Sequence, residues 1–143
     1  MPYAGQEIRR ANGFVVKIVT LEDELLEVEA DYRGDAPLAQ AHYHPHQDEH
    51  FEVLDGTIHA VIGGAEQWHR EGETFDVPAG TPHQMAAEGP TRIRWQVRPA
   101  LRTAEFFERF YDALDNGFPE GMSREQFLAE YADVFRLAEP DER

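Results

Sequence analysis

The sequence predicts an all-β domain, either a sandwich or a closed barrel, followed by a short α-helical extension. Between Phe14 and Arg98 the chain has several short segments in which apolar and polar residues alternate, and Gly and Pro turns separate them. After Pro99 the apolar residues recur about every 3.6 positions, which is the period of an amphipathic helix. We therefore expect a β domain over residues 1–100 and a two-helix extension over residues 101–143, packed on the barrel or at a dimer interface.

Three segments show the strand pattern most clearly. LLEVEADYR (25–33) alternates apolar with acidic residues, so it predicts a strand with one buried face. DGTIHAVIGG (55–64) places a strand between an Asp-Gly turn and a Gly-Gly turn, and the second turn predicts a hairpin into AEQWHRE (65–71). TRIRWQVRP (91–99) alternates again, with its arginines opposite the apolar face. The arginines expected in solvent are Arg92, Arg94 and Arg98.

Two helices are predicted after the last strand. Thr103 can cap the first helix, and Gly117 is well placed to end it. The second helix begins at Ser123, which can form a capping box with Gln126, and continues until Pro140 stops it. The apolar residues of both helices follow helical spacing, so packing against the rest of the protein accounts for them and no bound ligand is needed. The residues expected to face inward are Phe106, Phe107, Phe110, Tyr111 and Leu114 in the first helix, and Phe127, Tyr131, Val134 and Phe135 in the second.

The composition excludes several classes of protein. The 143 residues suit one domain, and a content of 41% hydrophobic and 29% charged residues is typical of a globular protein. The net charge of −15 would repel a phosphate backbone, so we expect no nucleic-acid partner. No apolar run approaches the roughly 20 residues of a membrane helix, and the N-terminus lacks the apolar segment of a secretory signal. We therefore expect a cytoplasmic protein with no membrane partner. Because the chain has no cysteine, any metal must be held by His and carboxylate.

The stretch HYHPHQDEH (42–50) concentrates four histidines, one aspartate and one glutamate in nine positions. Such a stretch could be a metal site, a proton-transfer site or a polar surface loop. Only alternate residues of a strand share a face, so His42 and His44 could bind the same ion. Glu49 precedes an apolar run that would anchor the next strand, and it could supply a third ligand. His83, which follows the turn PAGTP, is the candidate for a fourth.

Two motifs built on these residues resemble the signature motifs of the cupin superfamily. They read His42-x-His44-x4-Glu49-x6-Gly56 and Gly72-x5-Pro78-x-Gly80-x2-His83. The likeness covers roughly residues 25–98. It implies a single jelly-roll β-barrel in which His42, His44, Glu49 and His83 bind one divalent metal, while the Gly and Pro residues of the motifs form turns.

Strand parity predicts the lining of a pocket beside these ligands. The expected lining is mostly apolar and suits a small organic ligand or substrate. The residues that parity places there are Gln40, Phe51, Val53 and Met85. His46 follows a proline, and we expect it at the pocket mouth as a hydrogen-bond donor or proton shuttle. His50 and Glu52 have the opposite parity and should face away from the metal, whereas His59 and His69 are expected in solvent.

These features favour a mononuclear metalloenzyme. Imidazole and carboxylate ligands suit Fe, Mn, Ni, Co, Cu or Zn as the divalent metal. The first hypothesis is a dioxygenase-like activity in which a chelating substrate takes the open metal positions, and an isomerase, cyclase or decarboxylase using the metal as a Lewis acid is the nearest variant. The alternative is a non-catalytic protein whose metal fixes a small ligand or stabilises the barrel. The aromatic-rich helices also predict a homodimer.

Overall fold

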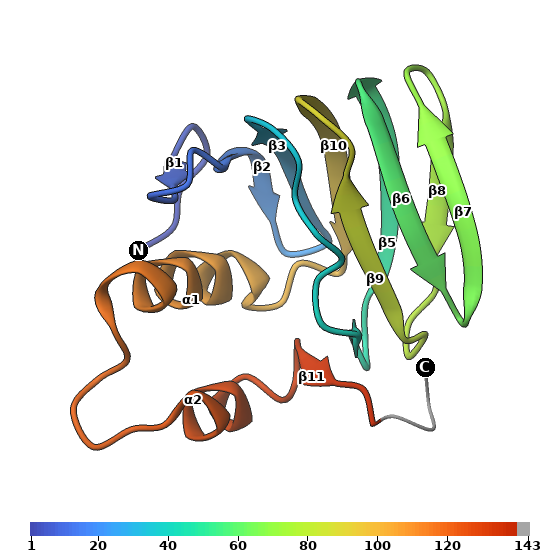
Figure 1. The fold of residues 1–143 in the computed structure, drawn as a ribbon. Helices are drawn as coiled ribbons and strands as arrows, with labels where there is room; N and C mark the ends of the chain where they lie inside the picture. The colour runs from blue at the N-terminus through green and yellow to red at the C-terminus, as the bar shows by residue number, and fades with distance from the viewer. Residues whose placement is uncertain (140–143) are drawn as a thin grey trace.

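The computed structural model describes residues 1–139, which form two β-sheets followed by two helices near the C-terminus (Figure 1). The strand order of the six-stranded sheet is β1 (Glu7–Arg9), β2 (Val15–Glu22), β3 (Leu25–Tyr32), β10 (Thr91–Arg98), β5 (Asp48–Asp55) and β8 (Thr74–Val77). The strand order of the five-stranded sheet is β11 (Arg136–Leu137), β4 (His42–Tyr43), β9 (His83–Ala87), β6 (Thr57–Ile62) and β7 (Ala65–Arg70). The two sheets form a sandwich, which confirms the predicted fold class.

Alternating side chains from both sheets fill the core. The predicted strand over 25–33 is β3, which lies between β2 and β10, and the predicted Gly-Gly hairpin joins β6 to β7. The side chains that these strands bury are Leu26, Val28 and Ala30 from β3, Ile58 and Ala60 from β6, and Ile93 and Val97 from β10. Arg94 lies on the other face of β10, as predicted, and pairs with Glu29 and Glu52 at 3.4 Å. Each fully buried Val, Leu or Ile contributes about 1.5–3 kcal/mol to folding.

Gly56 forms the tight turn between β5 and β6. Its φ is +89°, and a Cβ atom there would lie 2.5 Å from the carbonyl oxygen of Pro90 and 2.5 Å from Oγ1 of Thr91. Gly72 has a similar φ of +86°, but the space around its Cβ position is open. We expect Gly56→Ala to lower the free energy of unfolding by about 1–3 kcal/mol more than Gly72→Ala, because only the first substitution adds a steric clash. Urea denaturation measures both, and equal losses would contradict the steric argument.

The first helix, α1 (Thr103–Asn116), ends where the sequence predicts, because Gly117 has a φ of +97° and its N–H closes the last turn. The start of the helix differs from the prediction. Thr103 is the first helical residue, and Arg102 occupies the N-cap position without a side-chain hydrogen bond. The Thr103 hydroxyl is buried and accepts a hydrogen bond from the side chain of Gln47 at 2.8 Å, so it does not cap the helix. No helix in the described part of the chain is long and apolar enough to cross a bilayer.

The second helix, α2 (Arg124–Glu130), starts at the predicted capping box, in which Ser123 and Gln126 exchange hydrogen bonds. The helix ends earlier than predicted, at Glu130, and Pro140 lies outside the described residues. The chain then returns to the five-stranded sheet, where β11 pairs with β4. Pairing with a sheet edge satisfies backbone groups that a longer helix would have bonded internally, so tertiary structure outweighs helical spacing here.

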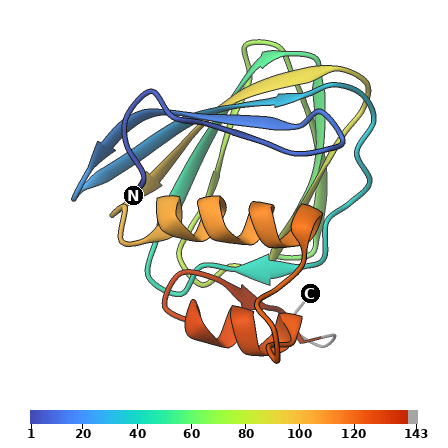
Figure 2. The same ribbon diagram turned by 90° about the vertical axis from the view of Figure 1, so that its left-hand side faces the viewer.

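The segment that follows α2, residues 131–137, is named the C-terminal segment below. It runs from α2 to β4, beside the strand that carries the first histidine of the cluster. Figures 1 and 2 show α1 lying across one end of the sandwich, with α2 farther from the six-stranded sheet and next to β11. The helices and the C-terminal segment therefore cover the end of the sandwich at which β4 lies.

Candidate metal centre

Three histidines from two neighbouring strands meet inside the sandwich. β4 begins at His42 and is followed by His44, while β9 begins at His83, which pairs with His42 across the two strands. One ring nitrogen of each histidine lies within 4.8 Å of the others. His44 and His83 are buried, with exposed fractions of 7% and 3%, and His42 is half-buried. Of the three interpretations of the stretch 42–50, this cluster favours a metal site, because a surface loop would leave the rings in solvent.

Backbone carbonyls fix the orientation of all three rings. The Nδ1 atoms of His42, His44 and His83 lie 3.0, 2.7 and 2.9 Å from carbonyl oxygens, which belong to Gln40, Val134 and Thr81 respectively. A carbonyl only accepts hydrogen bonds, so each Nδ1 must carry the proton. In the neutral ring the Nε2 atom is then left with a lone pair, which is the state that binds a metal.

The carboxylate of Glu49 faces the same cluster from β5 in the other sheet. The side chain is buried, with 2% exposed, and its Oε1 atom lies 3.1 Å from Nε2 of His44 and 3.1 Å from Nε2 of His83. Trp95 on β10 donates its Nε1–H to the other oxygen, Oε2, at 2.7 Å. Oε1 of Glu49 and Nε2 of His44 are both buried without a hydrogen-bond partner. Two facing acceptors are unfavourable unless a proton or a metal cation lies between them, so these residues fit a metal ion.

Electrostatics favour the metal-binding protonation state at Glu49 and His42, but a protonated ring at His44. Burial alone would raise the pKa of the Glu49 carboxyl, but the facing His44 and His83 lower it below its usual range. Burial and the neighbouring histidines lower the pKa of His42 to about 3. Burial also acts to lower the pKa of His44, but the Glu49 carboxylate outweighs it and raises this pKa. At neutral pH the site therefore holds an ionised carboxylate and a neutral His42, and both can donate a lone pair.

The C-terminal segment contributes to the site, which sequence reasoning missed. The carbonyl of Val134 is the acceptor that orients His44, and the ring of Phe135 stacks on His42 with centroids 4.7 Å apart. Both residues were expected in the second helix. No residue-level signal could reveal Val134, because its contribution is a backbone carbonyl. Trp95 was expected only as part of the apolar face of the strand over 91–99, although an indole N–H on a buried face requires a partner.

A cavity of about 380 Å³ opens beside the histidines. Three of the four residues that parity predicted line it, namely Gln40, Phe51 and Met85. Val53 does not line it, because this side chain lies deeper on β5, where it is fully buried and pairs with Ile93. The aromatic residues that line the cavity are Phe14, Tyr32, Phe51, Trp95, Phe106, Phe107, Phe110, Tyr111 and Phe135. The cavity therefore offers mainly aromatic surface to a ligand.

The remaining histidines lie away from the cluster. His46 is exposed and does not line the cavity, contrary to the position expected of a proton shuttle; Pro45 turns the chain outward there. His50 faces away, as predicted, and contacts Asp76 at 2.7 Å. His59 and His69 are not simply solvated as expected, because each stacks on an aromatic ring. The stacked pairs are His59 on Trp68 at 4.6 Å and His69 on Phe75 at 4.4 Å.

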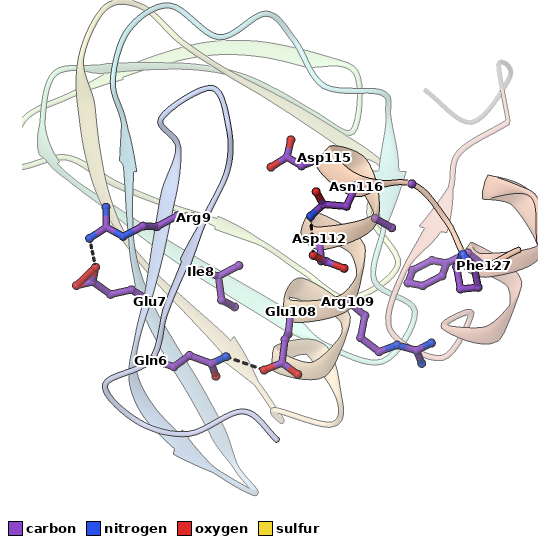
Figure 3. Close-up of a pocket in the computed structure, with 13 residues that line it drawn as sticks. Gln6, Glu7, Ile8, Arg9, Glu108, Arg109, Asp112, Asp115, Asn116 and Phe127 are labelled. Atoms are coloured by element: carbon purple, nitrogen blue, oxygen red, sulfur yellow. Dashed lines mark hydrogen bonds and ion pairs between the residues drawn. The ribbon is translucent and has the colours of Figure 1, made fainter.

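A second hollow of about 570 Å³ lies between β1 and α1 (Figure 3). The side chain of Gln6 donates a hydrogen bond to Glu108 across it at 2.6 Å. Its other polar lining residues include Arg9 and Asp112, which are exposed, and no histidine lines it. This hollow is larger than the cavity at the cluster, but it lacks buried groups that could bind a metal or transfer a proton. Among the described residues, the group of histidines that could hold a metal therefore lies at the smaller cavity.

Comparisons with known proteins agree with this architecture. Residues 28–97 match the Cupin_2 family, described as a cupin domain. KdgF from Halomonas sp. superposes with a TM-score of 0.56 at 23% identity, covering 66% of this chain and 86% of that chain. An RmlC-like cupin from Shewanella frigidimarina superposes with a TM-score of 0.60 at 17% identity, covering 69% of this chain and 87% of that chain.

A third similar structure is Pac13, described as a unique nucleoside dehydratase. It superposes with a TM-score of 0.55 at 11% identity and covers 67% of this chain and 77% of that chain. At these identities the likeness establishes a shared fold and not a shared activity. No curated protein matches the sequence significantly. The family match and the fold together show that residues 28–97 of this chain form a cupin domain.

Proposed function

We propose that this protein is a mononuclear metalloenzyme that acts on a small organic molecule. The observation that carries the proposal is a group of three histidine ring nitrogens within 4.8 Å of one another, with a buried carboxylate oxygen 3.1 Å from two of them, beside a cavity of about 380 Å³. A stabilising ion alone would need no such cavity, and a ligand pocket alone would need no buried acceptors facing one another.

In this proposal His42, His44, Glu49 and His83 hold one divalent ion. The donor set suits Fe, Mn, Ni, Co, Cu or Zn, and a six-coordinate ion would keep two positions for a chelating substrate. When bound, the ion supplies Lewis acidity or a site for dioxygen chemistry. The chain supplies the rest: backbone carbonyls orient the imidazoles, Trp95 holds the carboxylate, and the aromatic walls exclude water and position the substrate.

The support that Trp95 gives to Glu49 leads to a prediction. Trp95→Phe keeps a ring in the cavity but removes the hydrogen bond to Oε2, so we expect metal affinity to fall by about 10–100-fold. Competition with a chromogenic chelator measures the change. Trp68→Phe is the matched control, because this second tryptophan is 50% exposed and donates its N–H to Glu88, outside the cavity. Unchanged affinity in Trp95→Phe would show that this hydrogen bond does not support metal binding.

The reaction class proposed first is dioxygenase-like, with a Lewis-acid isomerase or cyclase second. The titratable cavity residues support chemistry that depends on the metal and not on a side-chain base. Burial raises the pKa of Tyr32 to about 12 and also raises that of Tyr111, so both phenols remain protonated at neutral pH. They can donate hydrogen bonds to a substrate but cannot accept its proton. No aspartate or glutamate is among the described residues that line the cavity.

The same lack of a cavity base favours a second candidate, a non-catalytic protein in which the metal fixes a small ligand. Metal content by mass spectrometry, followed by oxygen-uptake assays with flavonols and diketones, separates the candidates. One metal per chain with oxygen-dependent turnover supports the dioxygenase-like enzyme, and turnover without oxygen supports the Lewis-acid enzyme. Ligand binding without turnover under any metal supports the binding protein. Failure to retain any of the six metals at one per chain overturns the proposal of a metal site.

A further inference from the structure

A row of aromatic rings leads away from the metal-binding cluster along the wall of the cavity. It begins at Trp95, whose indole N–H is bonded to Glu49. The ring of Phe107 follows at a centroid distance of 5.0 Å, Tyr111 follows Phe107 at 5.5 Å, and Phe14 follows Tyr111 at 5.8 Å. A flat aromatic molecule can pack against successive rings of this kind.

Two arginines line the same cavity, and one of them lies at the far end of this row. Arg10 donates its backbone N–H to the carbonyl of Phe14 at 2.8 Å, so it lies where the row ends. Asp115 accepts two hydrogen bonds from the Arg10 guanidinium, at 3.1 and 3.2 Å, which holds the group in place and leaves further N–H donors. Arg124, the first residue of α2, lines the same cavity. Its guanidinium forms no ion pair or hydrogen bond with any residue that the structure describes.

These two arginines are distinctive because of the composition of the chain. The protein has 28 acidic and 13 basic residues. Nevertheless, apart from the histidines, Arg10 and Arg124 are the only ionisable side chains with a full charge at neutral pH among the described residues that line the cavity. A guanidinium binds a carboxylate through paired N–H groups, and an unpartnered guanidinium in a strongly acidic protein favours an anion from outside the chain.

We infer that the cavity binds a planar aromatic molecule with a carboxylate at the end remote from its metal-binding group. This inference rests on the proposed function, because the metal fixes the other end of the ligand. The aromatic body lies along the row from Trp95 to Phe14, and the carboxylate pairs with Arg124, which lines the same cavity as Arg10. The arginines are thus the groups that determine specificity, and neither is a metal ligand.

Binding of simple probes tests the inference without any assay of turnover. Naphthoate and naphthamide share a ring system and differ in charge, while octanoate has the charge without the rings. In a Trp68→Phe background Trp95 is the only tryptophan, so quenching of its fluorescence reports occupancy of the cavity. We expect naphthoate to bind about tenfold more tightly than naphthamide, in line with a charge-assisted hydrogen bond, and more tightly than octanoate.

Charge-removing variants identify the groups responsible. Arg124→Gln is expected to lower the naphthoate preference several-fold, and combination with Arg10→Gln is expected to abolish it. Arg70→Gln is the matched control, because Arg70 is exposed on β7 and does not line the cavity. Equal binding of naphthoate and naphthamide, or a preference that survives the double substitution, would overturn the inference. Circular dichroism of each variant verifies that the fold is retained.

Metal content and probe binding distinguish failure of this inference from failure of the proposed function. A protein that retains no metal but still prefers naphthoate refutes the metalloenzyme proposal and supports the anionic subsite. A protein that retains one metal per chain and converts a substrate, but binds the two probes equally, supports the metalloenzyme proposal and refutes the anionic subsite.

Discussion

Replacement of His83 by alanine is expected to abolish metal binding at one ion per chain. The ring of His83 is buried, its Nδ1 donates to a backbone carbonyl, and its Nε2 lies 3.1 Å from the Glu49 carboxylate. The substitution removes one of the ring nitrogens that meet at the site. The loss of affinity should exceed the roughly 10–100-fold change that follows removal of a supporting hydrogen bond. Metal content after dialysis against each candidate metal, followed by mass spectrometry, provides the measurement.

His46→Ala is the control for this prediction. His46 belongs to the same histidine-rich stretch as His42 and His44, but it is exposed and lies outside the cavity. This variant should retain the wild-type metal content. A bound ion also stabilises the folded state in proportion to its free concentration, so added metal should raise Tm in wild-type protein and in His46→Ala but not in His83→Ala. Equal metal content in both variants would exclude the histidine cluster as the site.

Replacement of Tyr131 by alanine is expected to cost about 3–5 kcal/mol of unfolding free energy, the usual loss for a large buried aromatic residue. Tyr131 is fully buried at the end of α2, with its ring 5.3 Å from that of Phe106 and 5.4 Å from that of Phe127. Its hydroxyl donates to Glu105 at 2.7 Å and accepts from Arg109 at 2.8 Å. Urea denaturation followed by circular dichroism measures the loss.

Tyr131→Phe separates packing from hydrogen bonding at this position. It keeps the ring and removes the hydroxyl group, so we expect a loss of about 1 kcal/mol. If the two Tyr131 variants lose the same stability, packing of the ring does not hold the C-terminal segment on α1. The alanine variant should also bind metal more weakly, since Val134, which orients His44, follows three residues later in this segment.

The sequence predicted the parts of the site that depend on local spacing. His42 and His44 share a face because they are two residues apart, and the turn before His83 brings the next strand beside them. Local spacing does not show how close to the site an inward-facing residue of a strand lies. Glu49, Phe51 and Val53 all face inward from β5, but only the first two meet the cluster or its cavity, and Val53 lies in the closed core.

The sequence could not predict the contacts between segments that lie far apart in the chain, for a different reason. The early end of α2 and the return of the chain to β4 depend on which sheet edge is free to pair, and that is a property of the assembled sandwich. The stacking of Phe135 on His42 follows from that pairing. Helical spacing correctly predicted that the apolar residues Val134 and Phe135 face inward, but it assigned them to the wrong element.

The family match ends at residue 97, whereas Val134 and Phe135 complete the surroundings of two of the histidines. Part of the wall beside the histidines is thus encoded outside the stretch that carries the proposed ligands, and the two stretches can diverge at different rates. A change in the tail would alter both the orientation of His44 and the surface that stacks on His42. Exchange of tails between proteins that share this fold is therefore expected to change metal affinity together with selectivity.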